Sequence, residues 1–162
     1  MSPYRGPELL APDHDVTNFD CDDKALDEWL RRRAPRNQLE GSSRTWVVTE
    51  DSRVVAFYAS STAVVARTEA TSRAARNQPD PLPAMLLGRL AVDRSHQGKG
   101  LAAALLKHFL LKAREVASLT GMRIVLVHAR DNEAAEFYRH FGFDPSPVDS
   151  LTLMLLVKDI KP

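Results

Sequence analysis

The chain has 162 residues, of which 44% are hydrophobic and 27% charged, with a formal net charge of +1. This predicts one domain over residues 1–162, with a sizeable core. No apolar run reaches the roughly 18 residues of a membrane helix, and no signal-peptide pattern opens the chain, so we expect a cytoplasmic protein without membrane contact. The single cysteine, Cys21, excludes an internal disulfide, and no metal-ligand spacing is present, so no metal is expected.

The charges are unevenly distributed along the chain. Residues 1–30 carry two basic and eight acidic side chains, a net of −6, whereas residues 31–79 carry nine arginines against four acids, a net of +5. This asymmetry favours one patch that faces a polyanion. A solvated helix face beside a mobile arginine-bearing loop explains the same charges equally well.

The N-terminal third predicts a helical segment. Leu9–Leu10 begin a short first strand, and the acids of Asp20–Asp23 are N-cap candidates for a helix from Lys24 to about Arg33. Pro35 must end that helix or begin a new one. A second short helix over Arg36–Glu40 would close at Gly41.

The remaining elements predict a mixed α/β chain. Thr45–Thr49 and Arg53 to about Ala66 form an antiparallel hairpin, followed by a polar loop over Arg67–Pro83. The later elements alternate: a strand over residues 86–92, a helix over about 98–119, a strand over 124–127, a helix over about 133–140 and a strand over 151–157.

The stretch from Leu86 to Ala103 predicts an anion site. An apolar strand ends at the polar turn 93–96, and the following turn contains two glycines and opens a helix. The first N–H groups of a helix have no partner within it, and its dipole is positive there. Glycine at 98 and 100 lets the backbone approach a phosphate closely. We therefore expect a phosphate-bearing ligand at this turn.

Three phosphate motifs compete for this turn. A P-loop needs Lys followed by Ser or Thr, but Lys99 is followed by Gly100, so that motif fails. The dinucleotide fingerprint is formally present over Gly98–Ala103, with Asp131 near the end of the next strand. Against it, the polar turn separates the strand from the glycines, and too little chain follows for a doubly wound sheet. The third pattern, Gln/Arg-x-x-Gly-x-Gly/Ala, matches residues 97–102.

With this third pattern the sequence resembles the GNAT superfamily of acetyl-CoA-dependent N-acetyltransferases. A second segment supports the resemblance independently: Asn132, then the run Ala135-Glu136-Phe137-Tyr138-Arg139-His140-Phe141-Gly142-Phe143. The resemblance implies a GNAT fold of the α/β (α+β) class, with a mixed, largely antiparallel sheet of about six to seven strands flanked by about four helices. It also implies acetyl-CoA as cosubstrate.

Further segments are similar to the TacT/AtaT branch of this superfamily, whose members are toxins of type II toxin–antitoxin pairs. They are Phe19-Asp20-Cys21, Leu26-Asp27-Glu28-Trp29-Leu30, Arg44-Thr45-Trp46-Val47, Leu87-Gly88-Arg89-Leu90-Ala91-Val92-Asp93, Val127-His128-Ala129 and Ser150-Leu151-Thr152-Leu153. The resemblance implies acetylation of the α-amino group of aminoacyl-tRNA, a block of translation, a ribbon-helix-helix antitoxin and a homodimer. Pro35 departs from the helix-compatible residue expected there, which puts the helix and a tRNA contact from Arg36 in question.

The resemblance also assigns roles to residues. The cofactor-binding set is Leu90, Ala91, Val92, Gln97, Gly98, Lys99, Gly100, Leu101, Ala102, Asn132 and Phe137. Tyr138 is the expected catalytic acid for the departing thiolate, because a phenol with a pKa of about 10 stays protonated at neutral pH. A core tyrosine that packs with Phe137 and Phe141 is the alternative.

Candidates for the polyanion or substrate are Arg31, Arg32, Arg33, Arg36, Arg67, Arg73, Arg76 and Arg89. Arg89 points into the acceptor cleft or pairs with Asp93 or Glu136. No general base stands out, and His128 is the one histidine that merits a test. Rival functions are acetylation of a small amine or a protein N-terminus, a CoA-binding regulatory module, and a dinucleotide oxidoreductase.

Overall fold

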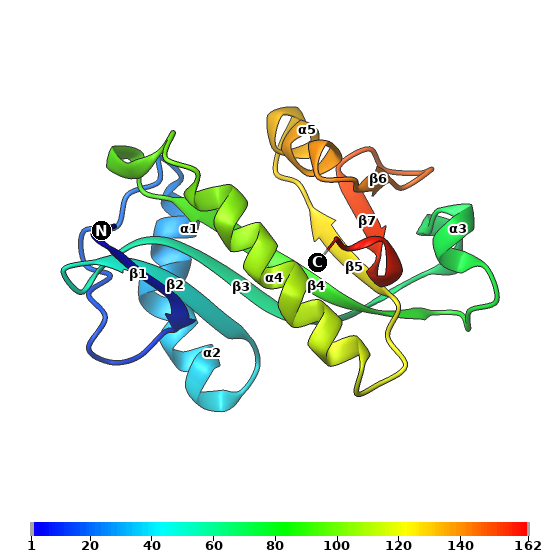
Figure 1. The fold of residues 1–162 in the computed structure, drawn as a ribbon, viewed down its shortest axis with the longest axis horizontal. Helices are drawn as coiled ribbons and strands as arrows, with labels where there is room; N and C mark the ends of the chain where they lie inside the picture. Colours follow the sequence, from blue (N-terminus) through cyan, green and yellow to red (C-terminus); the bar gives the residue numbers. More distant parts are fainter. Residues whose placement is uncertain (1, 162) are drawn as a thin grey trace. The chain divides into compact units, whose positions relative to one another are not determined.

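The structure, a computed structural model, describes residues 2–161 and contains a seven-stranded sheet in the order β1-β2-β3-β4-β5-β7-β6 (Figure 1). The strands are β1 (Tyr4–Leu9), β2 (Arg44–Glu50), β3 (Arg53–Val65), β4 (Leu82–Val92), β5 (Ile124–His128), β6 (Asp144–Pro145) and β7 (Thr152–Leu156). The helices are α1 (Lys24–Glu28), α2 (Ala34–Glu40), α3 (Ser72–Ala75), α4 (Leu101–Ala117) and α5 (Asn132–His140). The predicted mixed α/β class is confirmed.

The chain divides into two compact units. The first contains the residues up to Ser61 together with Gly88–His108, and the second contains Thr62–Leu87 together with the residues from Phe109 onward. Strands β3 and β4 and helix α4 pass through both units. The single domain that the sequence suggested stays a prediction, and each unit is described by itself.

The first unit is built on an antiparallel meander of β1, β2 and the first part of β3. The predicted β2–β3 hairpin is confirmed, and its turn residues Asp51 and Ser52 have positive φ values of 51° and 67°. The prediction that the first strand begins at Leu9 is wrong, because β1 ends there. Its register shifts between Arg5 and Glu8, around a proline, so its sequence lacks the alternation that marks a strand.

The helical segment of this unit is continuous through Pro35. Asp23 caps α1 by accepting from the N–H groups of Ala25 and Leu26, as predicted. Trp29–Arg33 then form a π-helical turn, in which the Ala34 N–H reaches back to the Trp29 carbonyl. This wider turn leads into α2, where Pro35 lies in the first turn, the place in a helix that tolerates its missing N–H and fixed φ best. Gly41 closes α2 at φ 78°, as predicted.

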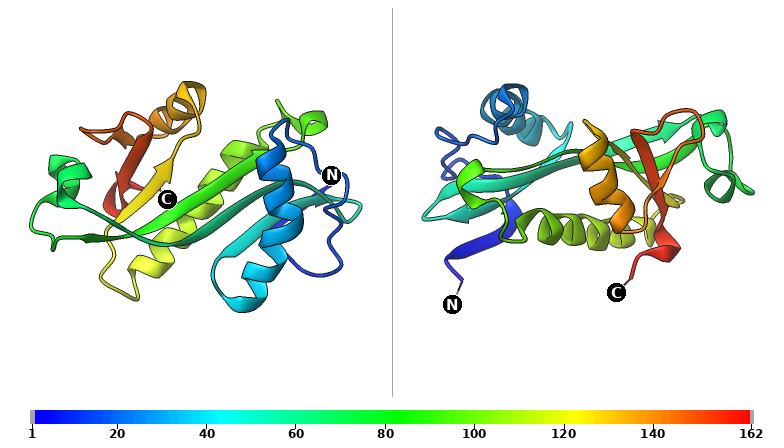
Figure 2. Two further views of the ribbon diagram at one scale, coloured as in Figure 1. Left: turned by 180° about the vertical axis from the view of Figure 1, so that it is seen from behind. Right: turned by 90° about the horizontal axis from the view of Figure 1, so that it is seen from above.

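Successive residues of β3 pack on opposite faces of the meander, as the pleat of a strand requires. Phe57 meets Trp29, with the rings stacked at 6.1 Å, on the face that α1 and α2 cover. Tyr58 bonds His108 at 2.7 Å through its hydroxyl, on the face covered by the first turns of α4 (Figure 2). The rings of Phe57 and Tyr58 are both fully buried, which contributes roughly 1.5–3 kcal/mol for each large apolar side chain.

The second unit is built on β4, β5, β7 and β6. β4 pairs in parallel with β5 from Ala84↔Ile124 to Leu87↔Val127, and β5 pairs antiparallel with β7. The predicted loop over Arg67–Pro83 is partly wrong, since it contains a 3-10 turn at Arg67–Glu69, helix α3 and the start of β4. Two alanines of α3 pack in the core of this unit and stabilise the helix. Four residues are too few to show a helical periodicity in the sequence, so α3 was not predicted. The two-residue strand β6 was not predicted.

Candidate active site

In the first unit, the turn after β4 is held open by two left-handed glycines. Gly98 and Gly100 have φ values of 78° and 81°, and a Cβ on either would meet nothing within 4 Å. Because of these dihedrals α4 begins at Leu101, not at Gly98 as predicted. The turn and the first N–H groups of α4 therefore present exposed backbone that an anion can approach without a side chain in the way.

The preceding turn is fixed by Asp93. Its carboxylate accepts the N–H of Ser95 at 2.9 Å and the N–H of Asp20 at 3.1 Å. Gln97, a predicted cofactor residue, donates from its side-chain amide to the Val92 carbonyl at 3.2 Å and so braces the same turn. Lys99, another predicted cofactor residue, is exposed.

The predicted pantetheine strand lies on the last part of β4. The β4–β5 pairing ends at Leu87, so Gly88–Val92 continue past the last paired residue. On its other edge this segment is tied to β3, as the bond from the Asp93 N–H to the Val55 carbonyl at 2.8 Å shows. A strand paired along one edge can accept an extended ligand along the other.

Arg89 lies in this segment with its guanidinium over the Trp29 ring, 4.2 Å from the ring centroid. Burial lowers the pKa of Arg89. The alternative that Arg89 pairs with Asp93 is wrong, because the guanidinium lies over Trp29 while the Asp93 carboxylate caps the turn described above. The alternative pair with Glu136, a residue of the second unit, stays a prediction. Within the first unit, Arg89 thus carries a half-buried charge against an aromatic ring.

In the second unit, Tyr138 is presented by α5, whose first turn is capped by Asp131 through the N–H of Ala134 at 2.8 Å. The Tyr138 side chain is only 6% exposed and packs edge-on against Phe137 and Phe143. Burial raises the pKa of its phenol. Within residues 2–161 its hydroxyl makes no hydrogen bond. Phe141 packs against Phe137 rather than against this ring.

Two further predicted cofactor residues lie on the same helix. Asn132 is the first residue of α5 and is exposed, and Phe137 is half-buried next to Tyr138.

The predicted arginine patch is split between the units. Arg31, Arg32, Arg33, Arg36 and Arg89 belong to the first unit, and Arg67, Arg73 and Arg76 to the second. Several are engaged in exposed ion pairs: Arg32 with Glu28 at 2.9 Å, Arg36 with Glu40 at 3.1 Å and Arg73 with Asp159 at 2.9 Å. Such pairs are worth only about 0–1 kcal/mol and exchange readily for phosphate.

Two side chains with reactive groups, Cys21 and His108, have structural roles in the first unit. The Cys21 thiol is buried, and burial together with its bond to Asp27 raises its pKa to about 12, which makes it a poor nucleophile. His108 packs against Trp46 with ring centroids 4.7 Å apart and bonds Tyr58.

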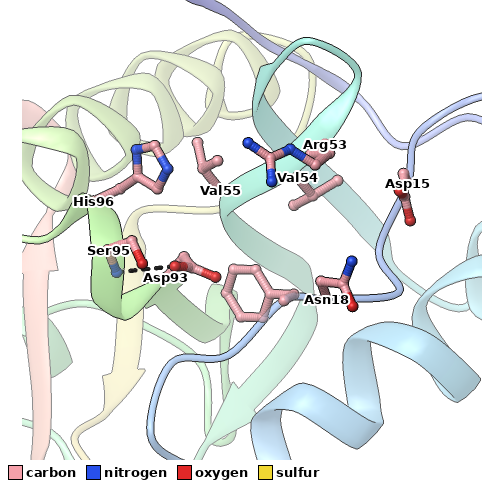
Figure 3. A pocket seen from close by; sticks show the side chains of 9 residues that line it. Asp15, Asn18, Arg53, Val54, Val55, Asp93, Ser95 and His96 are labelled. Carbon is pink, nitrogen blue, oxygen red and sulfur yellow. Dashed lines mark hydrogen bonds between the residues drawn. The ribbon is translucent and has the colours of Figure 1, made fainter.

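The first unit also contains a recess of about 230 Å³ that sequence reasoning missed (Figure 3). Its lining comes from the loop before α1, the start of β3 and the turn after β4: Asp15, Asn18, Phe19, Arg53, Val54, Val55, Asp93, Ser95 and His96. His96 is fixed at its rim by the Tyr4 hydroxyl at 2.8 Å. Three segments so distant in sequence offer no local signal of a common recess.

Within residues 2–161, no cluster of three or more His, Cys, Asp or Glu side chains is arranged to hold a metal ion. No helix in this range has the length and apolar character to cross a membrane.

The structure contains three features that suit an enzyme using an acyl-CoA. They are an open glycine backbone at the start of a helix, a strand that extends past its last paired residue, and a buried tyrosine. The protein-family profile described as Acetyltransferase (GNAT) domain matches residues 41–145. The chain belongs to the GNAT acetyltransferase family.

Two named proteins are similar to this chain over most of its length. The chain is 46% identical over 161 residues to a tRNA-acetylating toxin of Mycobacterium tuberculosis, covering 99% of this chain and 97% of that protein. It is 30% identical over 128 residues to an L-2,4-diaminobutyric acid acetyltransferase of Streptomyces anulatus, covering 70% of each chain.

Solved structures are similar over nearly the whole chain. AtaT complexed with acetyl-methionyl-tRNAfMet matches with a TM-score of 0.87 at 27% identity, covering 94% of this chain and 95% of that one. AtaTR bound with AcCoA matches with a TM-score of 0.81 at 26% identity, covering 94% of each chain. The GNAT fold expected from the sequence is confirmed.

Proposed function

We propose that this protein is an acetyl-CoA-dependent toxin that acetylates the α-amino group of aminoacyl-tRNA and thereby stops translation. The observation that carries the proposal is 46% identity, over 99% of the chain, to a protein named for tRNA acetylation. The likeness to AtaT in complex with its acetylated methionyl-tRNA supports the same substrate class.

Acetyl-CoA fits the chain's own backbone. The N–H groups over Gly98–Ala102 are placed to receive the pyrophosphate, because both glycines hold the turn open and α4 adds its positive end. Leu90–Val92 offer a free strand edge to the pantetheine arm, and an N–H there would stabilise negative charge on the thioester oxygen. We assign Asn132 and Phe137 of α5 to the same cofactor because of the family resemblance. The likeness to AtaTR bound with AcCoA supports this assignment.

The chemistry needs a neutral amine and a proton for the leaving thiolate. An α-amino group has a pKa of about 7.7–8.0, so a useful neutral fraction exists near pH 7, unlike the roughly 10.4 of a lysine side chain. Tyr138 supplies the proton. Its buried phenol, with a raised pKa and no internal hydrogen bond, remains protonated until a thiolate forms beside it.

For the tRNA we assign two kinds of contact. The exposed arginines, Arg31, Arg32, Arg33, Arg36, Arg67, Arg73 and Arg76, contact backbone phosphates. Arg89 and Trp29 form a stacked cation and ring beside the thioester segment, suited to the 3′ end of the aminoacyl-tRNA. A homodimer, a ribbon-helix-helix antitoxin and a cytoplasmic location complete the proposal. The likeness to AtaT bound to the C-terminus of the antitoxin AtaR supports an antitoxin as partner.

The direct test incubates the protein with labelled acetyl-CoA and charged total tRNA, followed by mass spectrometry of the aminoacyl ends. We expect N-acetyl-aminoacyl-tRNA, with one or a few amino acids preferred. Label that never reaches tRNA, in a protein that binds acetyl-CoA, would contradict the proposal.

A second candidate is acetylation of a small diamine, which the 30% identity to the diaminobutyric acid acetyltransferase favours. Free 2,4-diaminobutyrate in the same assay separates the two. Transfer to the diamine at a rate unaffected by ribonuclease identifies this second function, as transfer to tRNA alone identifies the first. A regulatory CoA-binding module transfers acetyl to neither, and an oxidoreductase binds NAD in place of acetyl-CoA.

A further inference from the structure

At the end of β5 in the second unit, three side chains form a chain of hydrogen bonds. His128 is the last residue of β5, and its Nδ1 lies 3.1 Å from the hydroxyl of Thr152, its partner in the antiparallel register with β7. The Thr152 hydroxyl in turn donates to Oδ2 of Asp149 at 2.9 Å. Thr152 is buried, whereas His128 is exposed.

Asp149 is held as a carboxylate. Its Oδ1 accepts the N–H of Leu151 at 3.0 Å, and its Oδ2 accepts the hydroxyl of Thr152. These two bonds, first the one from Leu151 and then the one from Thr152, lower the pKa of Asp149. An ionised carboxylate only accepts hydrogen bonds. The single proton of the Thr152 hydroxyl is therefore committed to Asp149.

This commitment fixes the tautomer of His128. Since the Thr152 oxygen gives its proton to Asp149, it accepts from the imidazole, so Nδ1 of the neutral ring carries the hydrogen. The lone pair is then on Nε2. Within residues 2–161 that nitrogen makes no hydrogen bond, and the side chain is exposed. The arrangement presents an oriented imidazole with its basic nitrogen directed away from the relay.

His128, Thr152 and Asp149 belong to the second unit, which also carries the predicted acid Tyr138 on α5. The last pair of β4 with β5 is Leu87↔Val127, so His128 is the first β5 residue past that pair. The bond from the Ala129 N–H to the Leu151 carbonyl at 2.7 Å holds β5 against the loop that carries Asp149. Helix α5, which carries Tyr138, begins at Asn132, four positions after His128 (Figure 1).

We propose that His128 is the base of the acetyl transfer, oriented by Thr152 and Asp149; this rests on the proposed function. The amine nitrogen forms a bond to the thioester carbon and passes its proton to His128 Nε2. As the carbon–sulfur bond breaks, Tyr138 gives its proton to the thiolate. One proton is taken and one is given, and exchange with water restores both side chains.

The tautomer is tested without substrate. In 15N-detected NMR of the histidine ring, we expect Nδ1 protonated in the neutral wild type. In Asp149→Asn the amide oxygen keeps the Leu151 N–H while its NH₂ donates to Thr152, which frees the hydroxyl to donate to Nδ1. The proton then moves to Nε2. Thr152→Ser retains the hydroxyl and the wild-type tautomer. An Nε2-protonated wild type overturns the relay.

The base is tested by kinetics and chemical rescue. We expect His128→Ala to lower kcat about 100-fold, the usual range for a base, with acetyl-CoA affinity unchanged. Added imidazole should raise the kcat of His128→Ala by at least about 10-fold. Asp149→Asn loses roughly 10-fold and Thr152→Ser less than about twofold, as expected for positioning residues. Tyr138→Phe, which lacks the acid rather than the base, gains nothing from imidazole.

The outcomes separate this proposal from the proposed function. Wild-type protein that acetylates no aminoacyl-tRNA refutes the proposed function, whatever the tautomer. An active wild type with an equally active His128→Ala refutes the base. A slow His128→Ala that binds acetyl-CoA normally but does not respond to imidazole also refutes it, since a structural role alone explains that pattern.

Discussion

The candidate groups of the two units differ in the kind of contact that they offer a ligand. In the first unit they are the backbone of an exposed glycine turn, a strand edge and a guanidinium stacked on a ring. In the second unit they are single side-chain atoms: a buried phenol and an imidazole oriented by a two-bond relay. The groups of the first unit should tolerate side-chain changes that leave the backbone conformation unchanged. Each group of the second unit depends on a single side-chain atom. Substitutions should therefore reduce affinity in the first unit and turnover in the second.

The largest effect is expected at Tyr138. Tyr138→Phe removes one hydroxyl without changing the packing against Phe137 and Phe143. We expect kcat for aminoacyl-tRNA to fall about 1000-fold, within the range for a lost general acid. Acetyl-CoA affinity, measured by calorimetry, should stay the same.

Tyr58→Phe is the matched control for this substitution. Tyr58 is also buried, and its hydroxyl bonds His108 at 2.7 Å. Its loss should reduce the free energy of unfolding by about 1 kcal/mol and leave kcat within about twofold. If Tyr138→Phe retained full turnover, Tyr138 would not be the general acid, and the expected difference between the two units would be refuted.

The next largest effect is expected at the glycine turn. Gly98→Ala and Gly100→Ala place a Cβ that meets no atom of residues 2–161 within 4 Å, but each holds alanine at positive φ, which costs about 1–2 kcal/mol. The added methyl also blocks close approach of a phosphate. We expect the Kd for acetyl-CoA to rise about 10-fold while kcat at saturation changes less than about threefold.

Gly121→Ala is the control here, because its Cβ also meets nothing within 4 Å and its φ lies outside the positive region. It should bind acetyl-CoA as the wild type does. Unchanged affinity in both turn variants would place the pyrophosphate elsewhere.

A smaller effect is expected at Arg89. Arg89→Met keeps the length and the contact with Trp29 but removes the charge. We expect kcat/KM for aminoacyl-tRNA to fall about 10-fold, with the KM for acetyl-CoA unchanged. Arg32→Met, at an exposed arginine paired with Glu28, should cost about threefold or less. Equal losses in the two variants would mean that Arg89 acts only as one more phosphate contact.

Local signals explain which features were predictable. The glycines, the Asp23 cap and the apolar strands act through neighbours in sequence, so the hairpin, the glycine turn before α4 and the α2 end at Gly41 follow from the sequence. Features that depend on partners distant in sequence could not be predicted in this way. For Arg89 the sequence left open a place in the acceptor cleft or an ion pair with an acid, and it did not indicate Trp29, 60 positions earlier, which lies beneath the guanidinium.

Two other failures have the same physical origin. The relay joins His128 to Thr152 across a register of β5 and β7 that no local pattern specifies. Helix α3 has only four residues, and its two core alanines give no amphipathic period. In both cases tertiary packing rather than propensity decides the outcome.

The smallest effect is expected at Cys21, which tests whether the first unit contributes any side-chain chemistry. Burial and the bond to Asp27 raise the pKa of this thiol to about 12, from the roughly 8.5 of an unfolded chain. At pH 8 the native thiolate fraction is then about 1000-fold lower, and alkylation by iodoacetamide, followed by mass spectrometry, should be slower by at least that factor than in urea. The raised pKa also predicts native stability that is complete below about pH 8.5 and declines as the pH rises toward 12. Cys21→Ala should leave kcat unchanged, because a thiol that stays protonated neither attacks the thioester nor takes a proton; a loss of turnover at unchanged stability would show that the first unit does more than bind.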